Sequence, residues 1–81
     1  MRVGSPGFNG ERLVEARELR GISATALALL VGVTPASISQ YQKGVTTPSP
    51  SVLSGIASKL GFPEGFFFLP DVEARMTAPF F

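Results

Sequence analysis

The sequence lacks the side chains on which most small-enzyme chemistry depends. Its 81 residues include no cysteine and no histidine. Without cysteine the chain has no disulfide and no thiolate metal site, and without histidine it has no imidazole ligand, imidazole base or Ser-His triad. Three of its six carboxylates, Glu11, Glu15 and Glu18, follow one surface pattern and do not form an acid–base pair. We therefore expect no enzymatic activity, no metal site and no cofactor.

Long hydrophobic runs are absent as well. No apolar stretch approaches the roughly 20 residues that a membrane-spanning helix needs, and the N-terminal MRVGSPGFNGER has no apolar core of the kind found in secretory signals. A chain of 81 residues has room for one folded core. We expect a single cytoplasmic domain with no membrane partner.

Charge is scarce and unevenly distributed. Charged residues make up 16% of the chain, and the net charge is +1. Residues 1–60 hold six Lys or Arg and three Glu, a net charge of +3, whereas residues 61–81 hold one Arg and three acids, a net charge of −2. The basic part suits an anionic partner, although a bias of this kind more often marks a solvated face.

Cap residues and glycines divide the chain into helices. The N-caps are Asn9, Ser23, Thr34 and Ser49, and the stops are Gly21, Gly32, Gly44 and Gly61. These signals predict helices over residues 10–20, 24–31, 35–43 and 50–60. A short fifth helix is expected to open at 62–64 and run through Phe68, although Gly65 disfavours it. Since no segment alternates with a period of two, the sequence predicts a compact all-α domain of four or five helices.

Residues 10–20 combine an apolar stripe with alternating charges. The stripe predicted to face the core consists of Leu13, Ala16 and Leu19. The cations are Arg12, Arg17 and Arg20, and their spacing favours pairs with Glu15 and Glu18.

The two short helices on either side of Gly32 form the most informative pattern. A steep crossing through a tight turn needs a small residue where the helices meet, a turn residue that tolerates positive φ, and apolar residues that return to the core. Ala28, Gly32, Ile38 and Tyr41 meet these needs. Further inward positions are predicted for Leu27, Val31 and Val33.

The segment LVGVTPASISQYQKG resembles the helix-turn-helix of lambda-repressor-like (XRE-type) DNA-binding domains. The resemblance extends from RLVEARELRGIS before it to PSVLSGIASKLGF after it and covers residues 9–68. It implies a helix over 35–43 that enters the major groove of double-stranded DNA. It also implies a sequence-specific transcriptional regulator, most simply a repressor, that binds an operator as a homodimer.

The resemblance also implies which residues face DNA. Base edges are expected beside Ala36, Ser37, Ser39 and Gln40, with Pro35 next to them. Phosphates are expected beside Ser23, Thr34, Lys43, Thr46 and Thr47, and within reach of Arg12. The family often has Gln where this chain has Ala24, and Pro35 and Ala36 offer no donors. Specificity then depends partly on DNA shape and outside contacts, or dimerisation supplements a modest affinity.

The segments outside this domain leave several alternatives open. Residues 1–8 are predicted to be a flexible leader, residues 9–68 the DNA-binding domain, and residues 69–81 a Phe-rich tail. One or two of Phe66, Phe67 and Phe68 are expected to cap the core, and the other aromatics suit a dimer seam. The run FPEGFFFLP followed by PFF is also similar to the junction in longer regulators, where an XRE-type domain precedes an ImmA/IrrE-like metallopeptidase domain. The tail would then be a linker to a missing domain, and this chain, without HExxH, carries no peptidase.

A protein-interaction module is the second functional hypothesis. It takes two forms: an antitoxin with a toxin partner, or a degenerate helix-turn-helix used for assembly. The donor-poor start of the helix over 35–43 favours this alternative.

Overall fold

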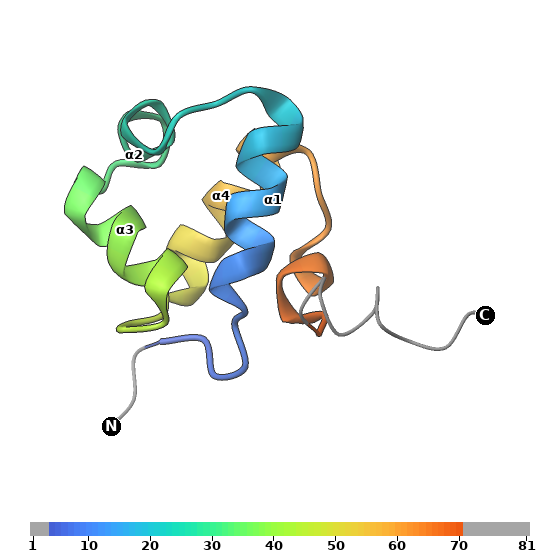
Figure 1. The fold of residues 1–81 in the computed structure, drawn as a ribbon. Helices are drawn as coiled ribbons and strands as arrows, with labels where there is room; N and C mark the ends of the chain where they lie inside the picture. Colours follow the sequence, from blue (N-terminus) through green and yellow to red (C-terminus); the bar gives the residue numbers. More distant parts are fainter. Residues whose placement is uncertain (1–3, 71–81) are drawn as a thin grey trace.

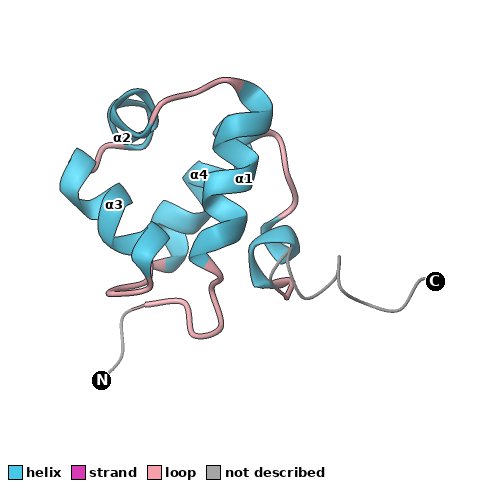
Figure 2. Cartoon of the chain, viewed as in Figure 1, coloured by secondary structure: helices cyan, strands magenta, loops and turns pink. Residues whose placement is uncertain are grey.

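Four α-helices and one short 3-10 helix build residues 4–70, the part of the chain that the computed structural model describes (Figure 1). The elements are α1 (Gly10–Arg20), α2 (Ala24–Val31), α3 (Pro35–Lys43), α4 (Pro50–Leu60) and η1 (Glu64–Phe68). Short loops join them, and residues 4–70 contain no strand (Figure 2). The four α-helices predicted from the sequence are confirmed, and the expected fifth helix is the 3-10 helix η1.

Each α-helix begins at its predicted cap. The side chains of Asn9, Ser23, Thr34 and Ser49 accept hydrogen bonds from backbone N–H groups of the first helical turn. A cap of this kind satisfies one of the donors that a helix start leaves without a carbonyl partner. Each helix ends at a glycine in the left-handed conformation. Cap and stop chemistry act over about four residues, so the sequence alone predicts these boundaries.

The turn between α2 and α3 depends on the backbone of Gly32. Its φ is +77°, and the backbone N–H groups of Gly32 and Val33 both donate to the carbonyl of Ala28, at 2.9 and 3.0 Å. A Cβ built on Gly32 would meet no atom within 4 Å, so the requirement for glycine is conformational and not steric. The helix axes are bent by 112° at this turn.

No single helix of residues 4–70 has the length and apolar composition to span a membrane. Only α2 and α3 taken together reach that length and composition, and they are the pair bent by 112°.

The core lies where the four α-helices and η1 meet. Its buried apolar residues are Leu13, Ala16, Leu27, Ala28, Ile38, Tyr41, Leu53, Ile56, Ala57, Leu60 and Phe67. Leu19 is 63% exposed, so its predicted place in the stripe is wrong. Three-residue steps fall about 60° short of a full helical turn, and two such steps rotate Leu19 away from the face of Leu13.

The helix η1 closes the core with aromatic side chains. Phe67 is fully buried, Phe66 packs partly buried against the core, and Phe68 remains 40% exposed. Phe8 stacks on Phe67 with ring centroids 5.8 Å apart. The expectation that one or two of the Phe66–Phe68 aromatics cap the core is confirmed, whereas the rest of the tail, 71–81, lies outside the described residues.

The sequence predicts a flexible leader over residues 1–8. In the structure, residues 4–8 of this segment pack against the domain instead, and Ser5 is only 7% exposed. Its backbone N–H donates to the Thr47 hydroxyl at 3.0 Å, and its own hydroxyl donates to the Pro48 carbonyl at 2.8 Å. These bonds join positions more than 40 residues apart, so no local pattern in the sequence predicts them.

The start of α1 lies directly against the end of α3. Gly10 is buried, and a Cβ built on it would overlap the backbone carbonyls of Tyr41 and Gln42. Only a residue without a side chain permits this approach. Gly55, in the interior of α4, has space instead, because its Cβ would meet the Val31 side chain at an ordinary 3.6 Å.

Replacing Gly55 and Gly10 by alanine should change the free energy of unfolding in opposite directions. Gly55→Ala should raise the free energy of unfolding by about 0.5–1 kcal/mol, because alanine favours a helix interior. Gly10→Ala should lower it by about 1–3 kcal/mol or more, because backbone carbonyls must move. Urea unfolding of both variants beside the wild type measures these differences, and a Gly10→Ala protein as stable as wild type would contradict the close approach of α1 to α3.

Candidate nucleic-acid interface

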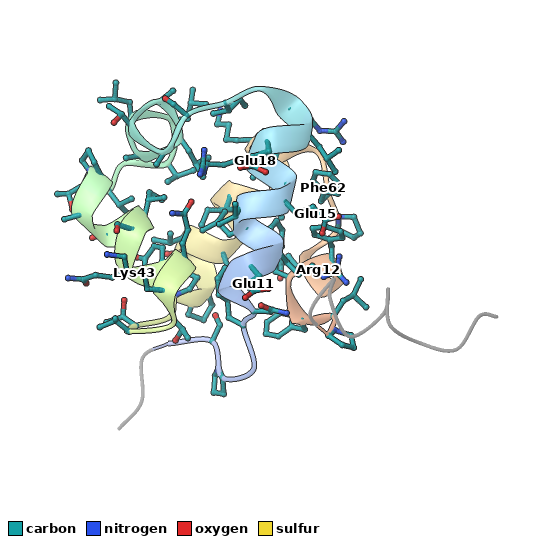
Figure 3. The ribbon with its side chains drawn as sticks, in the orientation of Figure 1. Glu11, Arg12, Glu15, Glu18, Lys43 and Phe62 are labelled. Atoms are coloured by element: carbon teal, nitrogen blue, oxygen red, sulfur yellow. The ribbon has the colours of Figure 1, made fainter. Side chains whose placement is uncertain are left out.

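The helix α3 has one buried side and one exposed side. Ile38 is fully buried and Tyr41 is 9% exposed, which confirms Tyr41 as a core residue. Ala36, Gln40 and Lys43 are exposed and follow each other at i, i+4 and i+7, so they share one face of the helix. This exposed α3 face presents a methyl group, an amide and an ammonium in order along the helix. Lys43 extends from α3 away from α1 (Figure 3).

The hydroxyl groups at the start of α3 are engaged with one another. The Thr34 hydroxyl accepts the Ser37 N–H and donates to the Ser37 side-chain oxygen, both at 3.0 Å. Thr34 therefore uses its one hydroxyl proton within the cap. The Ser37 oxygen accepts that hydrogen bond, and Ser37 keeps its own hydroxyl proton to donate elsewhere. Ser39 is half-buried beside the exposed α3 face.

The first turn of α2 and the loop after α3 lie on either side of this helix in sequence. Ser23 caps α2 by accepting the Ala26 N–H at 3.0 Å, which leaves its hydroxyl proton available. In the loop, Thr46 is exposed and Thr47 is half-buried. The Thr47 hydroxyl accepts the Ser5 N–H. The predicted phosphate contacts Ser23, Thr46 and Thr47 thus keep hydroxyl groups that can still donate.

Arg12 occupies a different place from the one proposed for a phosphate contact. It is fully buried, and its Nε and Nη2 donate to the Pro70 carbonyl at 3.1 and 2.6 Å. Its Nη1 pairs with the Glu15 carboxylate, and the guanidinium lies over the Phe66 ring. In Figure 3 it lies on the η1 side of α1, whereas Lys43 lies on α3. The pairing of Arg12 with Glu15 predicted from the sequence is confirmed.

Arg17 and Arg20 do not make the predicted pairs with glutamates, because backbone carbonyls and a glutamine lie closer. Arg17 donates to the Gln42 side-chain oxygen at 2.8 Å and to the Ile22 carbonyl at 3.0 Å. Arg20 donates to the Leu60 carbonyl at 2.6 Å and stacks on the Phe62 ring at 4.4 Å. Helix ends leave carbonyls without partners, and Arg20 satisfies such a group at the end of α4, whereas Arg17 bonds a carbonyl in the loop between α1 and α2.

The three arginines of α1 are therefore used inside the domain. Within residues 4–70, the cations that project from the surface without such partners are Lys43 and Lys59. Glu11, Glu15 and Glu18 lie along α1, where Glu15 and Glu18 are away from the exposed α3 face and Glu11 lines a hollow that also reaches Lys43 (Figure 3). Positive charge is thus sparse, and the part of it that belongs to the candidate interface is Lys43.

Titratable side chains are few elsewhere in the described part of the chain. No group of three or more metal-binding side chains occurs within residues 4–70. An open hollow beside the end of α3 has two charged side chains in its lining, Glu11 and Lys43.

Two short helices that cross steeply through a left-handed glycine, with a polar outer face on the second helix, define the helix-turn-helix class of proteins. The helix-turn-helix family HTH_3 matches residues 13–67. The chain belongs to this family. A search of curated proteins finds no match.

Solved structures share the fold. The P22 c2 repressor in complex with a synthetic operator is 29% identical, with a TM-score of 0.71 over 76% of this chain and 94% of that chain. The restriction-modification controller protein C.AhdI from Aeromonas hydrophila is 27% identical, with a TM-score of 0.68 over 73% of this chain and 89% of that chain. FeII HppE in complex with its substrate is 31% identical, with a TM-score of 0.67 over 82% of this chain but 38% of that chain.

The burial of Arg12 predicts a structural effect of its replacement. Arg12→Met should lower the free energy of unfolding by about 1–3 kcal/mol, because the Pro70 carbonyl loses two hydrogen bonds. Glu15→Gln is the matched control and should cost no more than about 1 kcal/mol, since a partly exposed carboxylate contributes little. Urea unfolding compares the two, and an equal loss in both variants would assign the stabilisation to the ion pair instead of the carbonyl.

Proposed function

We propose that this protein binds double-stranded DNA in a sequence-specific manner and represses transcription, with α3 in the major groove. The observation that carries the proposal is the exposed α3 face, held outward by buried Ile38 and Tyr41 and set at 112° to α2. The similarity to the P22 c2 repressor bound to its operator supports it. Two of the three similar structures described above are a repressor and a controller protein, which supports a regulatory rather than an enzymatic role.

Base recognition is assigned to exposed and half-buried residues along α3. The Gln40 amide suits adenine, because its oxygen and nitrogen match the N6 donor and N7 acceptor in the major groove. Ser37 and Ser39 have hydroxyl groups that can pair with either purines or pyrimidines, and Ala36 suits the thymine methyl. Gln40 is the side chain with the greatest share of the predicted specificity.

Phosphate binding is assigned to groups on both sides of α3. Lys43 supplies the charge, and Ser23, Thr46 and Thr47 supply neutral hydroxyl donors. Thr34 has only a supporting role in this set. Its hydroxyl proton is engaged with the Ser37 side chain, so Thr34 acts as a cap that orients Ser37. Arg12 is left out, because its guanidinium is buried against Pro70 and Phe66.

A single copy of this interface has little charge with which to hold DNA. Non-specific affinity comes mainly from phosphate neutralisation, and Lys43 is the one exposed cation among the described residues of the proposed interface. We propose that two copies bind a roughly palindromic operator, so that the second copy adds the missing contacts. The protein would then act in the cytoplasm, where bacterial DNA is found.

Replacing Gln40 and Lys43 should produce two different binding phenotypes. Gln40→Ala should cost about 1–3 kcal/mol on the selected operator and relax the preference at one base pair. Lys43→Ala should weaken all duplexes alike and reduce the salt slope by about one for each bound copy. An operator is first selected from a pool of random duplexes, and the variants are then titrated against it by fluorescence anisotropy at several salt concentrations.

Lys59→Ala is the matched control for charge, because Lys59 is exposed on α4 outside the proposed interface. It should bind with the affinity and salt slope of wild type. If the wild-type protein selects no sequence and binds no duplex better than Lys43→Ala does, the proposed function is wrong.

A further inference from the structure

The N-terminal segment, residues 4–8, is tied to the loop that follows α3. The Ser5 backbone N–H donates to the Thr47 hydroxyl at 3.0 Å, and the Ser5 hydroxyl donates to the Pro48 carbonyl at 2.8 Å. Ser5 and Pro48 are both buried. The approach is so close that a Cβ built on Gly4 would overlap the Thr47 hydroxyl oxygen. The segment therefore holds Thr47 from one side.

The bond from Ser5 decides what the Thr47 hydroxyl can do. A hydroxyl has one proton to donate and two lone pairs with which to accept. A backbone N–H can only donate, so the Thr47 oxygen must act as acceptor toward Ser5. The hydroxyl proton remains free to donate to another group. Phosphate oxygens only accept, so a hydroxyl oriented in this way suits a phosphate.

The loop has few other means of fixing this side chain. The backbone N–H groups of Val45 and Thr46 donate back to the Gln40 carbonyl, which orders the start of the loop. Pro48 has no N–H, and Ser49 belongs to the cap of α4. The bonds from Ser5 thus order the middle of the loop. A side chain ordered before binding loses less conformational entropy on binding.

We infer that the N-terminal segment is a positioning element of the DNA interface, in which Ser5 orients the Thr47 hydroxyl toward a phosphate of the duplex backbone. The inference rests on the proposed function. Ser5 is a positioning residue that acts through Thr47, and Gly4 permits the close approach. Residues 4–8, predicted from the sequence to belong to a flexible leader, would thus contribute to binding.

A double-mutant cycle on the full chain tests this coupling. Thr47→Val removes the hydroxyl and keeps the shape of the side chain. Ser5→Pro removes the N–H together with the hydroxyl that donates to Pro48, so its effect is measured relative to Ser5→Ala, which lacks only that hydroxyl. Each single variant should bind a mixed-sequence duplex at low salt about three- to tenfold more weakly than wild type, as expected for one lost hydrogen bond. In the double variant Ser5→Pro should cause no further loss, because the hydroxyl it orients is already absent.

Two further variants separate positioning from a general loss of structure. Thr47→Ser keeps the hydroxyl and should bind DNA with wild-type affinity. Gly4→Ala should weaken binding like Thr47→Val, whereas Gly65→Ala, whose Cβ would meet no atom within 4 Å, should bind like wild type. Urea unfolding of each variant checks that the protein remains folded under the binding conditions.

The outcomes distinguish this inference from the proposed function. If Lys43→Ala weakens binding but Thr47→Val and Ser5→Pro do not, DNA binding stands and the inference is wrong. If Ser5→Pro weakens Thr47→Val as much as it weakens wild type, its effect does not pass through the hydroxyl and the inference is also wrong. If the wild-type protein binds no duplex, both fail together.

Discussion

The bend between α2 and α3 depends on the positive φ of Gly32, and the exposed α3 face depends on that bend. With the two N–H groups at the turn bonded to the Ala28 carbonyl, α3 leaves α2 at 112°. Ile38 and Tyr41 then reach the core, and the opposite side of the helix is left exposed. A residue with a Cβ would strain this φ, although it would meet no atom, so the constraint lies in the backbone itself.

Arginine has an internal role in this domain. Arg12, Arg17 and Arg20 donate to carbonyls of Pro70, Ile22 and Leu60, which follow η1, lie between α1 and α2, and end α4, respectively. A guanidinium offers several donors in one plane, so one side chain can satisfy carbonyls and also stack on an aromatic ring. This use stabilises the ends of a small core, and it leaves little positive charge for an anionic partner. In the proposed complex, hydrogen bonding, DNA shape and a second copy would then supply more of the binding free energy.

Much of the candidate site was predictable from the sequence, because α3 has clear boundaries and the helical period separates its faces. Ile38 and Tyr41 were expected inside, and Gln40 and Lys43 outside, as the structure has them. The engagement of the Thr34 hydroxyl and the burial of Arg12 were not predictable. Both depend on which acceptor lies nearest in space: the Ser37 side chain for Thr34, and the distant Pro70 carbonyl for Arg12.

The sequence by itself determined where helices begin and end, because Asn9, Ser23, Thr34, Ser49 and the glycines act on backbone groups within about four residues. It also determined the helix-turn-helix, whose apolar residues, turn and spacing are local. Only the tertiary structure decided that Ser5 orders the loop at Thr47 and that Arg17 turns to Gln42. Those partners lie far apart in the chain, and a side chain selects among donors and acceptors only after packing has brought them together.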